Sequence, residues 1–368
     1  MARTAILPTD PAAVKLFSAE VAVDAAKKGY FSGKMEGSEA QKLPLVRKTD
    51  LESGAGDEVT MNLVAKLVGQ PIQGSEKLEG REMRLRNYTD KLRVDKFRNG
   101  VNIGDVMDQK RVKFSLREQA KARLTDYIAE VEDEMKMMYM AGARGVGTEI
   151  QHFPTDWTAF PNAFEAPDTS HLMYGGDATA KANVDSADKI GLAVLDRAKA
   201  RAKKFMGVEG AGAKTTPVEI QGGQHYVALL SVESEYDLRR ETGDMGWLAI
   251  QKAAAAAEGA KNPIFTGALG MYNDVIIHSH ENVIKFTDYG AGANVPACRN
   301  LFMGAHCAAV AYGFKGNGGV RYQLSESGLD HDEETVVHFR TILGIKKTRF
   351  NGMDFGLQTI DCAFTAIA

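Results

Sequence analysis

The sequence has few cysteines and no long hydrophobic run. Its three cysteines (Cys298, Cys307 and Cys362) are an odd number in a chain of 368 residues and form no CxxC pair. This excludes a disulfide framework and a zinc site of closely spaced thiols, and it suits a reducing compartment. No segment is long and apolar enough for a transmembrane helix, and the first residues lack the apolar core of a signal peptide. We therefore expect no membrane partner.

The chain also lacks an excess of charge of either sign. It has 45 Lys and Arg against 48 Asp and Glu, a net charge of -3, which argues against a protein whose main task is to coat nucleic acid. Glycine, by contrast, is abundant, with 37 residues. Many of them cluster at 142–147, 207–212, 290–292 and 316–319, which we interpret as joints between structural elements.

The longest regular pattern runs from Ser115 to Gly142 and predicts one long helix. Ser115 and Glu118 have the spacing of a capping box, and Gly142 can take the left-handed conformation that ends a helix. The apolar residues recur at steps of three and four and so share one face; they are Leu116, Ala120, Leu124, Tyr127, Ile128, Val131, Met135 and Met138. Such a helix is roughly 40 Å long, which indicates a plate-like or elongated molecule with one apolar stripe along this helix.

Residues 57–98 have the pattern of two charged strands. Val59 and Met61 alternate with polar residues, a turn-rich insert follows at 69–80, and residues 81–100 continue as a second strand. This predicts a long two-stranded arm with a flexible tip. A two-stranded ribbon is marginally stable alone, so we expect a neighbouring molecule to cover its apolar side.

The rest of the chain mixes helices and strands in irregular order. Residues 1–48 are a proline-punctuated arm with a short helical pattern at 12–28. Further helical patterns lie at 186–205, capped by Asp185 or Ser186, and at 246–258. Strand patterns are found at 217–221, 225–232, 273–280, 305–312, 320–324 and 334–368, the last split by the turn Asn351–Gly352. This order predicts an α+β fold.

Two glycine-rich segments resemble phosphate-binding loops only superficially. In GVEGAGAKTT (207–216), Ala213 separates Gly212 from Lys214, and a helix precedes the loop where a strand is required. GARGVG (142–147) lacks the spacing of a dinucleotide fingerprint. No serine lies in a G-x-S-x-G elbow. We therefore expect no cofactor and no enzymatic activity.

A metal-dependent hydrolase is one alternative. His278 and His280 lie two residues apart and so point to the same face of a strand, and four further candidate ligands occur later in the sequence: His306, Asp332, Glu333 and Glu334. Hydrolytic zinc motifs use a helical i, i+4 pair, however, and no third ligand is fixed by local spacing. Hydrogen-bonded or surface histidines are the simpler interpretation.

The basic residues of the arm offer a second alternative, a nucleic-acid-binding module at 81–98. These residues are interleaved with Glu82, Asp90 and Asp95, and few aromatic side chains accompany them. Charge complementarity with another protein is therefore the better interpretation. The predicted assembly interface comprises Lys77, Arg81, Arg84, Arg86, Lys91, Arg93, Lys96 and Arg98.

Four stretches of sequence, together with the order of the parts, resemble a known family. The stretches are DLESGAGDEVTMNLVAKLVG, EGREMRLRNYTDKLRVDKFRNGV, EQAKARLTDYIAEVEDEM and FRTILGIKKTRFNGMDFGLQTIDCAF. They are similar to the HK97-like major capsid proteins of tailed bacteriophages, and most similar to the family of the N4-like phages. Residues 145–330 match by the order of elements more than by wording.

The resemblance implies an HK97-like fold with five parts. These are an N-terminal arm (1–48), an E-loop hairpin (49–111), a spine helix with the first part of the P-domain (112–182), an A-domain (183–330) and the C-terminal strands of the P-domain (331–368). It also implies a non-enzymatic subunit that forms hexamers and pentamers of an icosahedral head around double-stranded DNA, bound without sequence specificity. Scaffolding, portal and decoration proteins are expected partners. The expected location is the virion, after assembly in the cytoplasm of the host bacterium.

Overall fold

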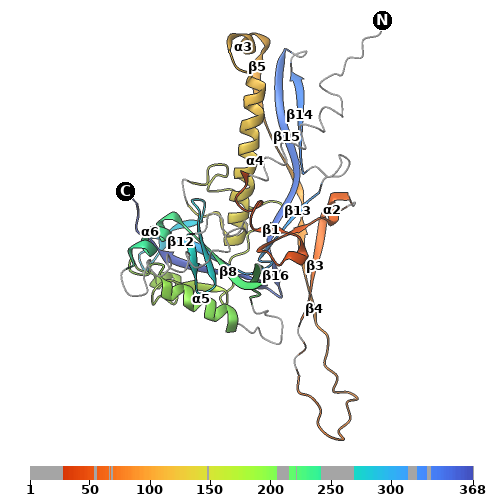
Figure 1. Cartoon of the computed structure of the whole chain (residues 1–368), viewed down its shortest axis with the longest axis vertical. Coiled ribbons are helices and arrows are strands. Elements are labelled where there is room, and N and C mark those ends of the chain that lie inside the picture. The colour runs from red at the N-terminus through yellow and green to blue at the C-terminus, as the bar shows by residue number, and fades with distance from the viewer. Residues whose placement is uncertain are drawn as a thin grey trace.

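The computed structural model is elongated (Figure 1). A long helix and a β-hairpin extend to one end, a compact sheet domain lies to one side, and a narrow ribbon projects to the other end. The structure describes residues 28–53, 56–65, 67, 69–146, 149–204, 215–220, 222–241, 269–313, 321–329 and 333–367. The predicted helix at 246–258 and most of the predicted helix at 12–28 lie outside these ranges, as does most of the loop 207–216.

Helices and strands alternate irregularly along the chain. The helices are η1 (Glu39–Gln41), α2 (Asp50–Ser53), α3 (Val106–Arg111), α4 (Leu116–Ala141), η2 (Lys181–Asn183), α5 (Leu192–Lys204) and α6 (Val232–Arg240). The strands of the first half are β1 (Glu36–Gly37), β2 (Leu45–Lys48), β3 (Glu58–Val64), β4 (Asn87–Arg93), β5 (Asp95–Asp105), β6 (Leu172–Tyr174), β7 (Val218–Ile220) and β8 (Gly223–Leu230). The later strands are β9 (Gly270–Tyr272), β10 (Val275–Ser279), β11 (Lys285–Tyr289), β12 (Val295–Met303), β13 (Ala308–Tyr312), β14 (Tyr322–Leu329), β15 (Glu334–Lys347), β16 (Arg349–Phe350), β17 (Met353–Asp354) and β18 (Leu357–Ala363). The predicted α+β class is confirmed.

Helix α4 has the predicted ends. The Ser115 hydroxyl accepts a hydrogen bond from the Glu118 backbone N–H (3.3 Å), and Gly142, at φ 70°, donates its N–H to the carbonyl of Met138. The prediction of a single apolar stripe is wrong for the second half of the helix, because residues 132–141 are buried on every side. A period of three to four residues indicates a helix with one covered face. The second half of α4 is instead surrounded by several segments of the chain, so its polar side chains are buried as well.

Strand β15 organises the sheet that packs on α4. Strand β2 joins β1 to β13, and β14 and β13 pair with successive stretches of β15, residues 334–341 and 343–347. Strand β5 also pairs antiparallel with β15, over residues 334–343. Side chains from α4, β5, β14 and β15 share one hydrophobic core. The β14–β15 hairpin and the first half of α4 therefore run together to one end of the molecule (Figure 1).

The second sheet forms the compact domain. Its order is β6-β18-β12-β8-β10-β9, with β11 on β12 and β7 on β8. Helix α5 packs on it through Leu195, Ala198 and Ala202. The helix begins at Leu192, whereas the sequence pattern predicts a start near 186. The difference arises because the Asp188 carboxylate accepts the backbone N–H groups of Asp177 and Asp185 and holds this segment in turns.

Candidate assembly surface

The projecting ribbon, which we call the arm (residues 57–94), has a root that is covered by its own chain. Strands β3 and β4 pair antiparallel from Glu58 with Arg93 to Val64 with Asn87. The inward side chains are buried against β13 and β16 in a separate small core, which consists of Leu51, Val59, Met61, Leu92, Val94, Ala309, Ala311 and Phe350. The prediction that only a neighbouring molecule covers the apolar stripe is therefore wrong for the root.

Polar contacts fix the same root. The buried Asn162 side chain accepts from the Arg93 N–H (3.0 Å) and donates to the carbonyls of Arg93 (2.9 Å) and Ile345 (3.1 Å). Asp90 accepts from the Lys346 ammonium and from the Arg349 backbone N–H. These contacts anchor β4 to the end of β15, so the root of the arm is part of the rigid body.

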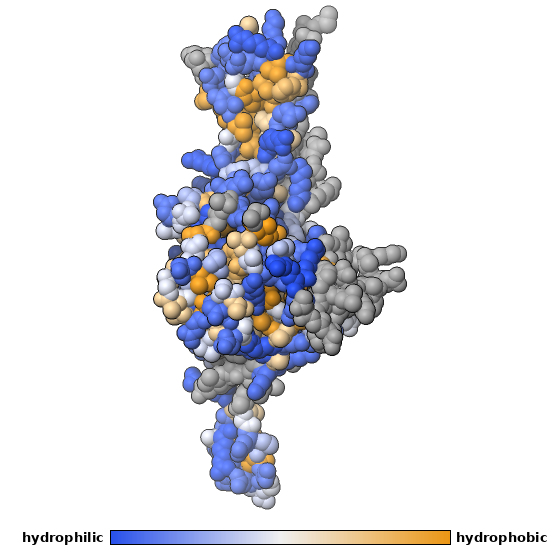
Figure 2. All heavy atoms as spheres, turned by 90° about the vertical axis from the view of Figure 1, so that its left-hand side faces the viewer, coloured by the Kyte–Doolittle hydropathy of each residue, from blue (hydrophilic) through white to orange (hydrophobic). Residues whose placement is uncertain are grey.

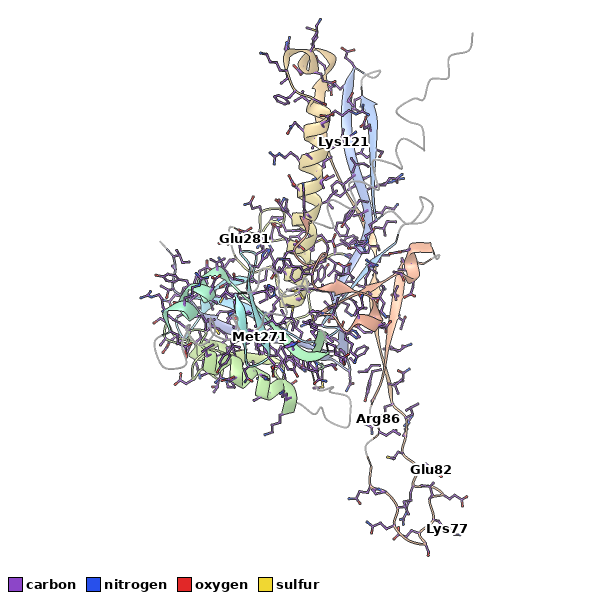
Figure 3. All side chains as sticks on the ribbon, viewed as in Figure 1. Lys77, Glu82, Arg86, Lys121, Met271 and Glu281 are labelled. Carbon is purple, nitrogen blue, oxygen red and sulfur yellow. The ribbon has the colours of Figure 1, made fainter. Side chains whose placement is uncertain are left out.

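Beyond the root, the arm leaves the body of the molecule. The last backbone bond between its two sides joins the Ala65 N–H to the carbonyl of Arg86 (2.9 Å), and the described residues from 69 to 86 form no strand. Four large apolar side chains here are 49–65% exposed: Leu67, Leu78, Met83 and Leu85. Figure 3 shows Lys77 at the far end of this segment and Arg86 where it joins the paired strands. We call residues 69–86 the arm tip.

A tight turn shapes the end of the arm tip. The Arg81 N–H bonds to the carbonyl of Leu78 (2.9 Å), and Gly80 between them has φ 83°. This is the geometry of a type II turn, which requires a residue that tolerates positive φ at its third position. Glu82 accepts the Gly80 N–H (2.9 Å), and Leu78 and Glu79 in this turn are both exposed.

The eight predicted interface residues lie in three places. Lys77, Arg81, Arg84 and Arg86 belong to the arm tip, whereas Lys91 and Arg93 lie on β4 at the root. Lys96 and Arg98 lie on β5, which pairs with β15 and is not part of the arm. The prediction of one continuous charged ribbon to residue 98 is wrong because the chain changes partner at Val94, whose side chain enters the small core of the root.

The basic residues of the arm also differ in their ion pairs. Lys91 and Arg93 hold the Glu58 carboxylate at 2.7 Å and 3.1 Å, and these hydrogen bonds lower the pKa of Glu58. Arg81 pairs with Glu76 at the arm tip. Lys77 and Arg84 have no ion pair within the described ranges, and both are exposed. These two cations therefore remain available to a partner.

The histidines of the hydrolase alternative lie in a packed environment. His278 is fully buried on β10, and the His280 ring packs edge-on against Tyr30 with ring centroids 4.7 Å apart. Burial lowers the pKa of His280. Among the described residues, no three His, Cys, Asp or Glu side chains lie close enough together to bind a metal ion. Asp332 lies outside the described ranges.

No helix within the same ranges is long and apolar enough to cross a membrane.

Sequence reasoning missed the apolar residues of the arm tip. Leu78 lies in the turn-rich insert, and Met83 and Leu85 alternate with charged residues as in a strand. The predicted strand is wrong for residues 81–86, since β4 begins only at Asn87 and both side chains are exposed. Sequence reasoning also missed Asn162, whose role depends on contacts with residues 69 and 183 positions away. The available signal for the arm tip was the group of apolar residues within and directly after the turn-rich insert 69–80.

The comparisons with known proteins agree with this geometry. The family model described as phage capsid protein matches residues 5–366. The major capsid protein of Pseudomonas phage KPP25 is 24% identical over 365 residues, covering 92% of this chain and 90% of that protein. The capsid of Ralstonia phage GP4 is 43% identical, covers both chains fully and superposes with a TM-score of 0.85. The capsid of cyanophage Pam1 shares the fold at 22% identity, with a TM-score of 0.69 and coverage of 93% and 94%.

These matches extend over almost the whole chain and include the arm, the spine helix and both sheets. They confirm the predicted HK97-like fold and a place in the virion shell; the N4-like subfamily stays a prediction. The chain therefore belongs to the phage capsid protein family, as a major capsid protein.

Proposed function

We propose that copies of this chain form the hexamers and pentamers of an icosahedral head, with the arm tip of each copy lying on a neighbour. The observation that carries the proposal is that Leu67, Leu78, Met83 and Leu85 are 49–65% exposed to solvent among the described residues. Large apolar side chains gathered at one projecting end mark an interaction site. Closed shells of identical subunits repeat such a contact around each symmetry axis.

The basic residues of the arm fit the same role. Lys77 and Arg84 flank the apolar side chains of the arm tip and would orient it on an oppositely charged surface. Lys96 and Arg98, on β5, would contact a neighbour at a different point from the arm tip. We propose the five-part division of the chain as well, with the projecting part of the E-loop limited to about residues 65–86.

The proposal also covers the contents, the place of assembly and the partners of the shell. We infer a non-enzymatic subunit that encloses double-stranded DNA, assembles in the host cytoplasm and meets portal, scaffolding and decoration proteins. A net charge of -3 agrees with a container that encloses DNA without coating it tightly.

The test is a triple substitution of the arm tip, L78S/M83S/L85S. The unfolding free energy of the unassembled protein should change by less than about 0.5 kcal/mol, because these side chains are exposed, while shells should disappear from electron micrographs and sedimentation profiles. The matched control is L92S in the root, which should destabilise the subunit itself. Normal shells from the triple variant would refute the proposal.

A further inference from the structure

A cavity of about 200 Å³ lies beside the small core that holds the root of the arm. Its walls come from η1 and β2, from β3 of the arm, from the start of β13 and from the segment 348–355. Strands β1, β3 and β16 lie close to one another in this region (Figure 1). Figure 2 shows apolar surface at the free end of α4 and a smaller apolar area on the arm. The cavity belongs to neither surface, because its lining residues come from the place where the arm joins the body.

One side of the cavity is apolar and aromatic. Met61 and Leu63 face it from β3, and Phe350 and Phe355 face it from the turn region after β15. The two phenylalanine rings pack edge to face, with centroids 5.4 Å apart and an angle of 87°. Aromatic rings favour a further ring in an offset or edge-on arrangement. An apolar cavity of about 150 Å³ is enough to hold benzene, so this one has room for a small flat ring system.

The opposite side carries a buried hydrogen-bond acceptor. The backbone N–H of His306 donates to the carbonyl of Leu43 (2.9 Å) and holds the residue at φ 59°. The imidazole forms a hydrogen bond with the backbone of Glu39, which uses the donor nitrogen of a neutral ring. The other nitrogen, Nε2, is buried and has no hydrogen-bond partner among the described residues. A buried acceptor without a partner is unfavourable, so a ligand that donates to Nε2 would be stabilised here.

The charges around the cavity favour a neutral ligand. Lys48 and Glu39 form an ion pair of 2.8 Å, in which the lysine side chain is 15% exposed and the glutamate side chain 72%. These two charges compensate each other. Burial lowers the pKa of His306, and Lys48 and Lys42 lower it further, against the opposing effect of Glu39. The imidazole is therefore neutral at pH 7, and its Nε2 atom accepts a hydrogen bond.

We propose that this cavity binds a small neutral heteroaromatic compound that donates an N–H hydrogen bond to His306 Nε2. The ring packs against Met61, Leu63 and the two phenylalanines, as an indole ring would. Such a compound contacts β3 as well as η1 and the segment 348–355, so it stabilises the root of the arm. The inference does not depend on the proposed shell contacts, because the whole site belongs to one copy of the chain.

A pair of probes of equal shape tests the site. Indole carries the N–H donor, and indene has a CH₂ group in its place. Isothermal titration calorimetry of the full-length protein should show that indole binds about tenfold more tightly than indene, because only indole satisfies the buried acceptor. H306N keeps the left-handed backbone, which Asn tolerates, and removes Nε2. In this variant the two probes should bind equally.

A matched control and a second measurement complete the test. H225N, the same substitution on β8 in the other sheet, should keep the preference for indole, and circular dichroism establishes that both variants are folded. Indole should also slow hydrogen exchange of β3 in the wild type. The inference is overturned if indole does not bind, if it binds no better than indene, if the preference survives in H306N, or if exchange of β3 is unchanged by indole.

Discussion

Glu132 and Lys136 lie one turn apart on α4 and form an ion pair of 2.7 Å inside the protein, where their side chains are 8% and 0% exposed. The Lys136 ammonium also binds Glu36 (3.0 Å) and Ser32 (2.8 Å). Glu132 accepts in addition from the hydroxyl groups of Tyr312 (2.5 Å) and Tyr322. The cluster joins the segment that precedes β1 to the spine helix and to two strands, so it determines how the N-terminal part lies on the core.

Lys136→Met should destabilise the protein by about 3–5 kcal/mol, because it leaves the buried Glu132 carboxylate without its cation and Glu36 with only Arg321, 3.8 Å away. Burial lowers the pKa of Lys136, but the adjacent carboxylates of Glu132 and Glu36 outweigh burial and raise it, so the lysine is charged throughout the accessible pH range. Urea unfolding of the unassembled protein measures the loss. Lys110→Met, at an exposed site, is the control and should change stability by less than about 0.5 kcal/mol; a loss as small for K136M would contradict the account of the cluster.

Acid should remove stability through Asp168. Burial raises the pKa of this carboxyl, but hydrogen bonds from His171 and Ser170 outweigh it and bring the pKa to about 2. A folded-state pKa below the ordinary value contributes stability that is complete above about pH 5 and is lost as the pH falls toward 2. The contribution is about 2 kcal/mol.

The Asp168→Asn variant isolates the contribution of the Asp168 carboxylate to the unfolding free energy. The difference in unfolding free energy between wild type and variant should shrink steadily from pH 5 to pH 2.5. A difference that stays constant over this range would show that Asp168 does not titrate as described.

Gly142→Ala should destabilise the end of the spine helix more than an ordinary glycine substitution. The residue has φ 70°, and a Cβ there would lie 2.0 Å from the carbonyl oxygen of Glu165. Gly352 has φ 74° and no heavy atom within 4 Å of the same position, so Gly352→Ala measures the backbone strain alone, about 1 kcal/mol. Thermal unfolding of the two variants separates the clash from the strain; equal losses would contradict the close approach.

Asn162→Ala should loosen the root of the arm. The variant loses three hydrogen bonds to Arg93 and Ile345 in a buried setting, which should cost about 2–4 kcal/mol locally. Hydrogen exchange of β3 and β4 should then accelerate relative to β18, which lies in the other sheet. Unchanged exchange in β3 and β4 would show that the small core alone holds the root.

Local patterns predicted much of the fold. Ser115 and Gly142 mark the ends of α4 because caps are local, and the turn at Asn351–Gly352 has the positive φ values (54° and 74°) that its sequence indicates. Helix α6 and strands β11 and β12 were not predicted. Strand β12 is buried because it pairs with β8 and β18, which lie far from it in the sequence, so local periodicity does not indicate it.

The candidate site was predicted only in part. The interleaved charges identified the arm as an interaction element. Its end at Val94 was not predicted, because there the chain passes from β4, which pairs with β3, to β5, which pairs with β15. The buried charges at the end of α4, such as Glu134 (2% exposed), look like a solvated face in the sequence. Their partners, including the backbone N–H groups of Gln151 and His152, come from a loop that periodicity does not place.

The most direct test of the central claim is a cryo-electron microscopy map of the assembled shell, read at the arm tip. The account predicts that Leu78, Met83 and Leu85 lose their exposure against a different copy of the chain, while Val59 and Leu92 keep the intramolecular cover of the root. An arm tip that folds back onto its own subunit, or that stays open to solvent in the closed shell, would contradict it.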